Sequence, residues 1–173
     1  MKNVLIVVDM QVDFVNGSLG TAEAEAIVPA VARKVAEHQG PVIFTRDTHP
    51  ADYLNTQEGR NLPVVHCVKG TEGWQIVPEL RPYAEREGAV IVDKPTFGSV
   101  ELARRLAAEV DGIASIELVG LCTDICVVSN ALLLKATMPE VPISVDSACC
   151  AGVTPQKHAA ALETLRSCQV AVR

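Results

Sequence analysis

The sequence predicts an α/β protein: a three-layer α/β/α sandwich built around a six-stranded, mainly parallel sheet of Rossmann type. Short β-branched runs alternate along the chain with segments of helical periodicity, which is the pattern of βαβ units. The runs are continuously apolar, as expected of parallel strands that are buried on both faces. A chain of 173 residues has the length of one domain, and we expect residues 1–173 to form it.

Strands and helices are expected in alternation. The six strands are predicted at residues 3–9, 41–46, 89–93, 115–120, 142–146 and 169–172. The first helix follows at residues 23–38, where Ile27, Val31 and Val35 share one face and Gly40-Pro41 ends the helical pattern. Three later helices each begin at a Ser or Thr that can cap a helix N-terminus. They are expected from Ser99 to the residues before Asp111-Gly112, from Thr123 to about residue 137, and from Thr154 to about residue 166.

The composition excludes several classes of protein. Fifteen basic and 21 acidic residues give a formal net charge of −6, and only 3% of the residues are aromatic. A nucleic-acid-binding surface is therefore not expected, because it needs basic and stacking side chains. The apolar runs are far shorter than the ~20 residues of a membrane span, and the segment before Asp9 is too short for a secretory signal. We expect a cytoplasmic protein. Its six cysteines include no CxxC pair, and because a chain with 49% hydrophobic residues can form a core without disulfides, we expect them to be reduced thiols.

Four predicted strands end next to residues that can carry out chemistry: Asp9, Asp47, Lys94 and, in the first turn of the following helix, Cys126. Open parallel sheets bind ligands at the carboxyl ends of their strands, so we expect these side chains to meet. A helix N-terminus and a nearby ammonium can lower the pKa of a thiol from about 8.5. We therefore predict Cys126 as a nucleophile, Lys94 as the cation beside it, and Asp9 as the group that accepts and returns its proton.

Each of these residues alone has an ordinary structural explanation. A single cysteine in a helix is usually buried packing, and an aspartate at a strand end is usually a turn or cap residue. The joint placement of the three favours the chemical interpretation. No competing motif is present: the chain has no glycine-rich dinucleotide or phosphate loop, no GxSxG and no HExxH.

A second group lies in the long connection at residues 47–88, which has weak periodicity and contains two of the four histidines. Connections of this length are uncommon in compact domains and are usually functional. Two carboxylates and two imidazoles suit a divalent ion, with zinc preferred and manganese or iron as alternatives. The predicted ligands are Asp47, His49, Glu58 and His66. The alternative is a hydrated loop with scattered polar residues.

The chain resembles a known family, the isochorismatase-like cysteine hydrolases, and within it the nicotinamidase/pyrazinamidase branch. The resemblance covers nearly the whole sequence. It rests on five segments: VVDMQVDF, RDTHP, HCVKGTEGW, DKPTFGS and GLCTDICV. The last is the most specific, because it matches the family's nucleophile motif G-x-x-T-D-x-C-V.

The resemblance implies an isochorismatase-like fold and the hydrolysis of a small amide to an acid and ammonia through a thioester on Cys126. It also implies that Asp9, Lys94 and Cys126 are the catalytic triad. A cis peptide is implied between Leu121 and Cys122, which would turn the Cys122 N–H toward an oxyanion beside that of Cys126. In nicotinamidases the metal binds the pyridine nitrogen of the substrate, and the predicted metal ligands match those of part of the branch.

The substrate pocket departs from the pattern of the branch. Nicotinamidases often hold the ring between an aromatic residue near the first motif, here Phe14, and a tryptophan shortly before the last metal histidine. Leu62 stands near the second position. Tyr53 or Trp74 would then replace that ring, or the pocket takes another amide. Trp74 also has a structural alternative, in which it covers the core.

Three functions remain open on the sequence. The first is an amidohydrolase acting on nicotinamide or pyrazinamide. The second is a related cysteine hydrolase acting on a carbamoyl, ureido or other small amide, and the third is a non-enzymatic metal- or redox-responsive binding protein. We expect no nucleic-acid or membrane partner. Leu132–Leu134, which are either core or a subunit contact, and the apolar long connection indicate a homo-oligomer.

Overall fold

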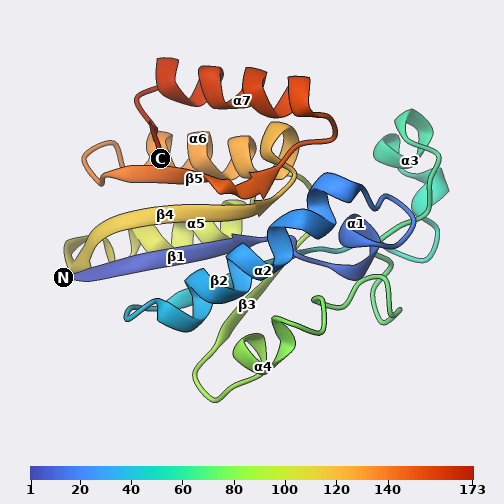
Figure 1. The fold of residues 1–173 in the computed structure, drawn as a ribbon, viewed down its shortest axis with the longest axis horizontal. Coiled ribbons are helices and arrows are strands. Elements are labelled where there is room, and N and C mark those ends of the chain that lie inside the picture. The colour runs from blue at the N-terminus through green and yellow to red at the C-terminus, as the bar shows by residue number, and fades with distance from the viewer.

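The computed structural model describes residues 1–173 and contains a six-stranded sheet (Figure 1). All neighbouring strands are parallel, in the order β3-β2-β1-β4-β5-β6. The strands are β1 (Lys2–Val8), β2 (Val42–Asp47), β3 (Val90–Lys94), β4 (Ile113–Leu121), β5 (Ile143–Ala151) and β6 (Ala171–Val172). The six predicted strands are thus confirmed, and the sheet is wholly rather than mainly parallel.

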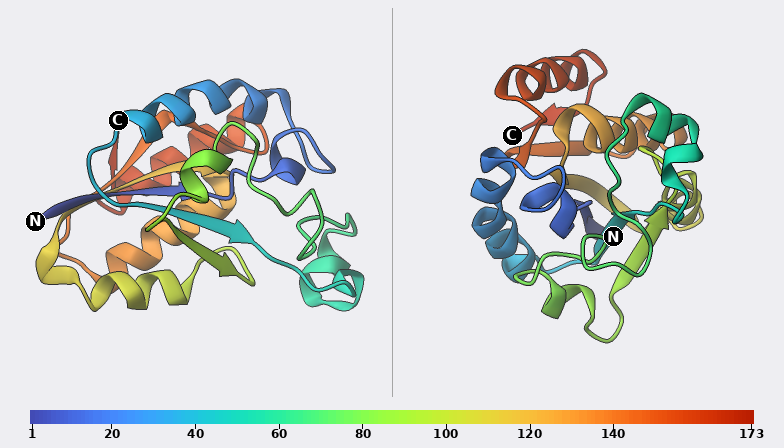
Figure 2. Two further views of the ribbon diagram at one scale, coloured as in Figure 1. Left: turned by 90° about the horizontal axis from the view of Figure 1, so that it is seen from below. Right: turned by 90° about the vertical axis from the view of Figure 1, so that its right-hand side faces the viewer.

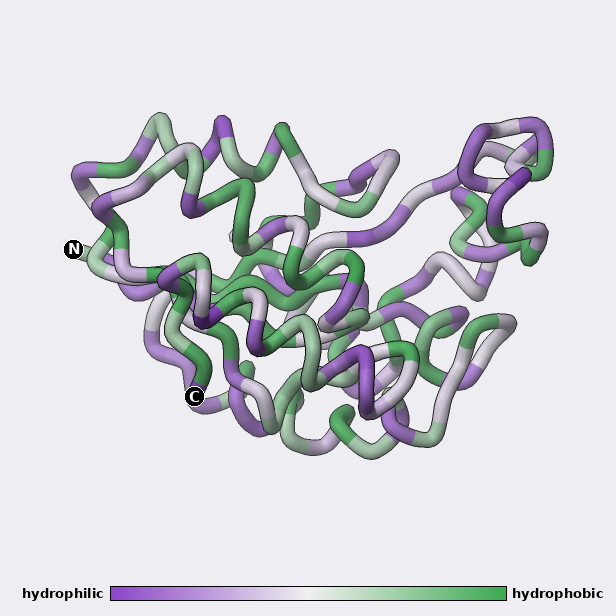
Figure 3. Tube along the Cα trace, turned by 90° about the horizontal axis from the view of Figure 1, so that it is seen from above, coloured by the Kyte–Doolittle hydropathy of each residue, from purple (hydrophilic) through white to green (hydrophobic).

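Helices cover both faces of the sheet (Figure 2). The longer ones are α2 (Ala22–Glu37), α5 (Val100–Ala107), α6 (Val128–Thr137) and α7 (Pro155–Ser167). One apolar core lies between the sheet and α2, and the other lies between the sheet and α5, α6 and α7. Figure 3 shows the apolar residues concentrated on the central strands. No helix combines the length and apolar character needed to cross a membrane.

Two of the three expected helix caps are present. The side chains of Ser99 and Thr154 accept hydrogen bonds from backbone N–H groups in the first turns of α5 and α7, and Thr21, which was not predicted as a cap, does the same for α2. Thr123 was expected to cap the helix after β4, and this prediction is wrong. The N-cap is Cys122, and Thr123 is the first residue of a π-helical turn, η3 (Thr123–Val127), that leads into α6.

The long connection between β2 and β3 contains only short helical pieces. They are η1 (Tyr53–Asn55), α3 (Gln57–Asn61) and α4 (Arg81–Ala84), while α1 (Val12–Val15) follows β1 and η2 (Val110–Gly112) precedes β4. The connection runs past the carboxyl ends of the strands, where α3 stands out from the body of the molecule (Figure 1).

The centre of the sheet is where a ligand site is expected. Strand β1 lies between β2 and β4. After β1 the chain adds β2 and β3 on one side of it, and then crosses to the other side to add β4, β5 and β6. Open α/β sheets bind ligands outside the carboxyl ends of the strands at such a switch point. The ends of β1, β2, β3 and β4 meet there.

Candidate functional site

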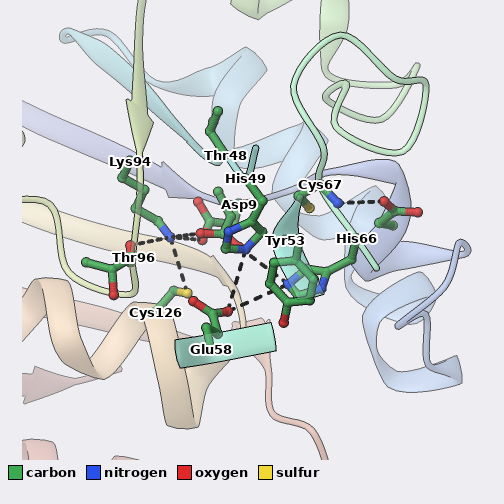
Figure 4. Close-up of polar contacts among 12 residues, drawn as sticks. Asp9, Thr48, His49, Tyr53, Glu58, His66, Cys67, Lys94, Thr96 and Cys126 are labelled. Atoms are coloured by element: carbon green, nitrogen blue, oxygen red, sulfur yellow. Dashed lines mark hydrogen bonds and ion pairs between the residues drawn. The ribbon is translucent and has the colours of Figure 1, made fainter. Parts of the chain in front are cut away.

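The predicted residues meet at this edge of the sheet (Figure 4). Asp9 directly follows β1, Asp47 ends β2, Lys94 ends β3, and Cys126 lies in η3 after β4. Asp9 and Lys94 are fully buried, and Asp47 and Cys126 are nearly so. The topology therefore collects two carboxylates, one ammonium and one thiol from four separate strand ends.

Lys94 is the centre of the first group. Its Nζ lies 2.6 Å from Asp9 Oδ2 and 3.4 Å from Cys126 Sγ. It also donates to the carbonyl oxygen of Thr96 at 3.1 Å. The other oxygen of Asp9 accepts a 2.6 Å hydrogen bond from the hydroxyl of Thr45 on β2. The Lys94 ammonium is thus in reach of both other members of the predicted triad, the carboxylate and the sulfur.

Burial and charge together determine the protonation states of this group. Burial raises the pKa of the Asp9 carboxyl above its ordinary value, although Lys94 opposes that shift. Burial alone would lower the pKa of Lys94, but the neighbouring carboxylates of Asp9 and Asp47 outweigh it and raise that pKa. The Lys94 ammonium is therefore permanently charged at neutral pH.

The thiol differs from the sequence-based expectation. We expected Lys94 and the helix start to lower the pKa of Cys126, but it is raised well above its ordinary value. Burial in the protein is the largest cause, and the negative charge of Asp9 adds to it. Cys126 is thus a neutral thiol at rest, and forming the thiolate requires proton transfer to a neighbouring base.

Side chains from two other helices hold the turn that carries Cys126. Asn130 on α6 is buried and donates to the carbonyl oxygen of Cys126 at 2.8 Å. His158 on α7 pairs through Nδ1 with the hydroxyl of Thr123 at 2.8 Å. The peptide bond between Leu121 and Cys122 is cis, as the family resemblance implied.

The second predicted group also comes together. One ligand atom from each of Asp47, His49, Glu58 and His66 lies within 4.8 Å of the others. His49 Nε2 is 2.8 Å from Asp47 Oδ2 and 3.5 Å from Glu58 Oε1. His66 Nε2 is 3.6 Å from the same aspartate oxygen. Ligands held at about 2.0–2.2 Å from one zinc ion are roughly 3–3.5 Å apart, so the four residues lie near the spacing that a single divalent ion needs.

Two further observations support a metal at this point. His49 Nε2 is buried and has no hydrogen-bond partner, although a carboxylate oxygen lies close to it. His66 Nδ1 lies 2.7 Å from the carbonyl oxygen of Val64, an arrangement that keeps the proton on Nδ1 and leaves the Nε2 lone pair free. Two imidazoles and two carboxylates are the donor set of zinc, manganese or iron sites.

The ionisable side chains of this group shift one another's pKa values. Burial would raise the pKa of Asp47, but the two imidazoles and Lys94 outweigh it and hold the pKa well below its ordinary value. Burial and the charge of Asp47 raise the pKa of Glu58. Burial would lower the pKa of His66, but the nearby carboxylate of Asp47 and the Val64 carbonyl outweigh it and raise that pKa. Asp47 is therefore an anion around which the other groups are arranged.

Asp47 belongs to both groups. Its Oδ2 faces the two histidines, and its Oδ1 lies 3.2 Å from Lys94 Nζ. One carboxylate thus connects the candidate metal group with the ammonium that lies beside the thiol. The two groups form a continuous site rather than neighbouring sites.

A cavity of about 250 Å³ opens onto both groups. Cys126 and Cys122 line it, and so do Asp47, Glu58 and His66. Most of the remaining wall is apolar and includes Phe14, Leu19, Leu62, Phe97, Leu121, Ile125 and Val153. This volume and lining suit a small ring with one polar group that reaches the sulfur.

The pocket residues expected from the sequence divide into two sets. Phe14 and Leu62 line the cavity, whereas Tyr53 and Trp74 do not. Tyr53 is fully buried behind the metal group, where its ring packs against His49 and His66 and its hydroxyl donates to the carbonyl oxygen of Leu62. It supports the pocket without forming its wall.

Trp74 has the structural role that was the alternative for it. Its Nε1 donates to the hydroxyl of Thr48 at 2.8 Å, and the guanidinium of Arg46 lies 3.6 Å from the centre of its ring. The aromatic ring that reaches the cavity in its place is Phe97, which sequence reasoning missed. Phe97 lies in the DKPTFGS segment three residues after Lys94, and its position there is the signal that could have identified it.

Comparison with known proteins gives a consistent result. An isochorismatase domain model matches residues 3–173. The nicotinamidase of Saccharomyces cerevisiae is 30% identical over 120 residues, which cover 52% of this chain and 55% of the yeast protein. The chain therefore spans about half the length of that curated relative.

Solved structures match over the full length. The zinc complex of the pyrazinamidase of Pyrococcus horikoshii superimposes with a TM-score of 0.83 at 29% identity, covering 100% of this chain and 99% of the other. A nicotinamidase/pyrazinamidase from Bacillus subtilis gives a TM-score of 0.82 at 27% identity, with 99% of both chains covered. The six-stranded fold is therefore the one found in these enzymes.

Proposed function

The chain belongs to the isochorismatase family, and we propose that it is a cysteine amidohydrolase that converts nicotinamide or pyrazinamide to the acid and ammonia. The observation that carries this proposal is the position of the Cys126 thiol. It lies against a buried ammonium and opens onto a small, largely apolar cavity that also borders a metal-binding group.

In the first half of the reaction, the substrate carbonyl carbon lies next to Cys126 Sγ. The thiol proton passes to Asp9, and the sulfur forms a bond to the carbonyl carbon. Lys94, 3.4 Å from the sulfur, stabilises the developing thiolate. Backbone N–H groups of Cys122 and Cys126 are the expected donors to the oxyanion. Asp9 then returns the proton to the amide nitrogen, the C–N bond breaks, and ammonia leaves a thioester on Cys126.

In the second half, a water molecule attacks the thioester carbonyl. Asp9 accepts one proton of the water, the C–S bond breaks, and the proton returns to the sulfur as the acid leaves. The raised pKa of the buried Asp9 suits this work, because the group has to hold and release a proton during turnover. Water and amide are consumed, acid and ammonia are formed, and the thiol is regenerated.

Asp47, His49, Glu58 and His66 would hold the metal, as the donor set and the unpartnered His49 Nε2 support. When bound, a divalent ion with an open coordination position offers a Lewis-acidic contact to a ring nitrogen of the substrate. The residues of the chain do the rest of the positioning: Phe14 and Leu62 border the ring space, and Phe97 and Ile125 narrow it.

The test measures ammonia released from nicotinamide by the purified, zinc-loaded protein. We expect release by the wild type and a loss of at least about 10³-fold in Cys126→Ala, since the thioester cannot form. A circular dichroism spectrum identical to that of the wild type shows that the variant is folded. Wild-type protein that releases no ammonia from nicotinamide or pyrazinamide would contradict the substrate assignment.

Two alternatives use the same site. The first is a carbamoyl, ureido or other small amide as the substrate; it is favoured by Leu62 standing where nicotinamidases often have an aromatic ring. A panel of such amides, assayed for ammonia, distinguishes it from nicotinamide. The second is a metal- or redox-responsive binding protein, which would bind zinc and release no ammonia from any member of the panel.

Three further expectations belong to this proposal: zinc as the resident metal, a cytoplasmic location and a homo-oligomer. Metal analysis of the purified protein tests the first. The expectation of an oligomer was based partly on Leu132–Leu134. Leu134 is buried in the core formed with α5, α6 and α7, however, and Leu132 and Leu133 pack against that core. Light scattering coupled to size-exclusion chromatography tests what remains of that expectation.

A further inference from the structure

Gln11 is a fully buried polar residue for which the proposed chemistry has no use. It lies two residues after Asp9, between β1 and α1. It does not line the cavity, and it touches neither the thiol nor the candidate metal ligand atoms. A side chain amide without access to water must nevertheless satisfy its hydrogen bonds, and those bonds define its role.

Two of the three hydrogen bonds of the Gln11 amide are to the backbone of one residue, Asp47. Gln11 Oε1 accepts from the Asp47 N–H at 2.7 Å, and Gln11 Nε2 donates to the Asp47 carbonyl oxygen at 2.9 Å. The second proton of Nε2 goes to the carbonyl oxygen of Trp74, also at 2.9 Å. The amide therefore pairs with Asp47 as a backbone peptide group does within a sheet.

The sheet itself explains why Asp47 needs this partner. Strand β1 pairs with β2 only as far as Val7, opposite Phe44, and the chain then turns away at Asp9 with a φ of +47°. On its other side β2 continues to pair with β3, with Asp47 opposite Lys94. The edge of Asp47 that faces β1 would thus have no backbone partner, and the Gln11 side chain takes the place of the missing strand.

We propose that Gln11 is a positioning residue that fixes Asp47 for metal binding and for its contact with Lys94. This inference rests on the proposed metal-dependent function. The Asp47 carboxylate has to present one oxygen to the histidines at 2.8 and 3.6 Å and the other to Lys94 at 3.2 Å. Both contacts depend on the orientation of one Cα–Cβ bond, and the reciprocal amide bonds fix the peptide groups on both sides of it.

The test measures the affinity of the protein for Zn²⁺ by competition with a chromophoric chelator, without substrate. Gln11→Glu keeps the size of the side chain but turns an oxygen toward two carbonyl groups, and Gln11→Met removes all three hydrogen bonds at similar volume. We expect Zn²⁺ binding to be weakened about 10- to 100-fold in both, as for other residues that orient metal ligands. The visible spectrum of the Co²⁺-loaded protein should change, because the coordination geometry changes.

Val35→Ala is the matched control. Val35 is a buried residue of α2 in the core on one face of the sheet, and its truncation lowers the melting temperature without touching the site. If Gln11 only fills space, its variants will resemble Val35→Ala, with lower stability but wild-type Zn²⁺ affinity and Co²⁺ spectrum. That result overturns the proposal, as does a wild-type protein that binds no Zn²⁺. If the Gln11 variants bind Zn²⁺ more weakly as expected but the wild type does not hydrolyse nicotinamide, only the substrate assignment is contradicted.

Discussion

The reactive group is a cluster of buried charges whose members cannot be changed independently. Asp9 and Asp47 both lie within 3.2 Å of the Lys94 ammonium, and the thiol of Cys126 is the neutral fourth member. Removing one partner of a buried ion pair leaves an uncompensated charge, which is more costly than the pair itself is stabilising. Each charge also shifts the pKa of the Cys126 thiol: the carboxylates raise it, and the ammonium lowers it.

Opposite effects of Asp9→Asn and Lys94→Met on the Cys126 thiol are therefore expected. Removing the negative charge of Asp9 lowers the pKa of Cys126, whereas removing the ammonium raises it. Asp9→Asn thus gives a more easily ionised sulfur together with almost no amide hydrolysis, because no group remains to carry the proton. The measurement is the pH dependence of Cys126 alkylation by iodoacetamide, read by peptide mass spectrometry. Equal shifts of both variants in one direction would contradict the assignment of charges.

Position 73 has to be a glycine because the carboxylate of Asp13 lies where a side chain would begin. A Cβ atom at position 73 would overlap that carboxylate, whose Oδ2 accepts a 2.8 Å hydrogen bond from the Cys67 N–H beside His66. We expect Gly73→Ala to destabilise the fold by about 1–3 kcal/mol and to weaken Zn²⁺ binding, since Asp13 has to move. Chemical denaturation and chelator competition measure the two effects. Gly112→Ala is the matched control, because its Cβ meets no atom within 4 Å.

At the residue scale, strand ends were the informative positions. Asp9, Asp47 and Lys94 could be placed from the sequence because each follows a run of buried apolar residues and therefore lies at one edge of the sheet. The protonation state of Cys126 could not, because it depends on how completely the site excludes water. The same applies to the aromatic wall: whether Phe97 or Trp74 reaches the cavity depends on the path of two loops.

At the scale of elements, regular pieces followed from local patterns, and the irregular turn did not. Strands β1–β5 are apolar runs, and α2, α5 and α7 have side-chain caps, so both kinds of element are local features. The π-helical turn η3 has no such signal. It is held locally by Asn130 in the adjoining α6 and, from farther along the chain, by His158 of α7, so its form depends in part on a tertiary contact.

The contact between η3 and α7 predicts a pH-dependent stability. Burial lowers the pKa of His158 below its ordinary value of about 6.5, so the folded protein disfavours the charged ring. The contribution of neutral His158 is complete above that value and is lost as the pH falls toward the lower pKa of the folded state. We expect His158→Gln to reduce the loss in melting temperature between pH 7.5 and 5.5 (read by differential scanning fluorimetry).

Thr123→Val is the second variant in that experiment. It removes the hydroxyl that meets His158 Nδ1 but keeps the shape of the side chain. Since burial is the main cause of the lowered pKa, this variant should be less stable than the wild type at both pH values and keep the same pH dependence. If His158→Gln and the wild type lose melting temperature equally on acidification, then His158 does not contribute to it.

At the scale of the whole molecule, the order of the strands explains why one site can hold both chemical groups. Because β1 is central, the proposed nucleophile Cys126 follows β4 on one side of it, and the candidate metal ligand Asp47 ends β2 on the other. The long connection after β2 then supplies Glu58 and His66, and Asp13 and Gln11 after β1 fasten it to the body of the protein. Metal binding therefore joins segments that are distant in sequence.

Removal of the metal should for this reason lower the stability of the entire fold. The four ligands come from β2, α3 and the connection around them, and an ion that binds only the folded state stabilises it in proportion to its saturation. At a free Zn²⁺ concentration of 100 times the dissociation constant, the gain is about 2.7 kcal/mol, or roughly 5–10 °C in melting temperature. Differential scanning calorimetry of apoprotein and of protein titrated with Zn²⁺ measures it, with His66→Ala as the variant that should respond least. A melting temperature independent of Zn²⁺ in the wild type would contradict a metal at this site.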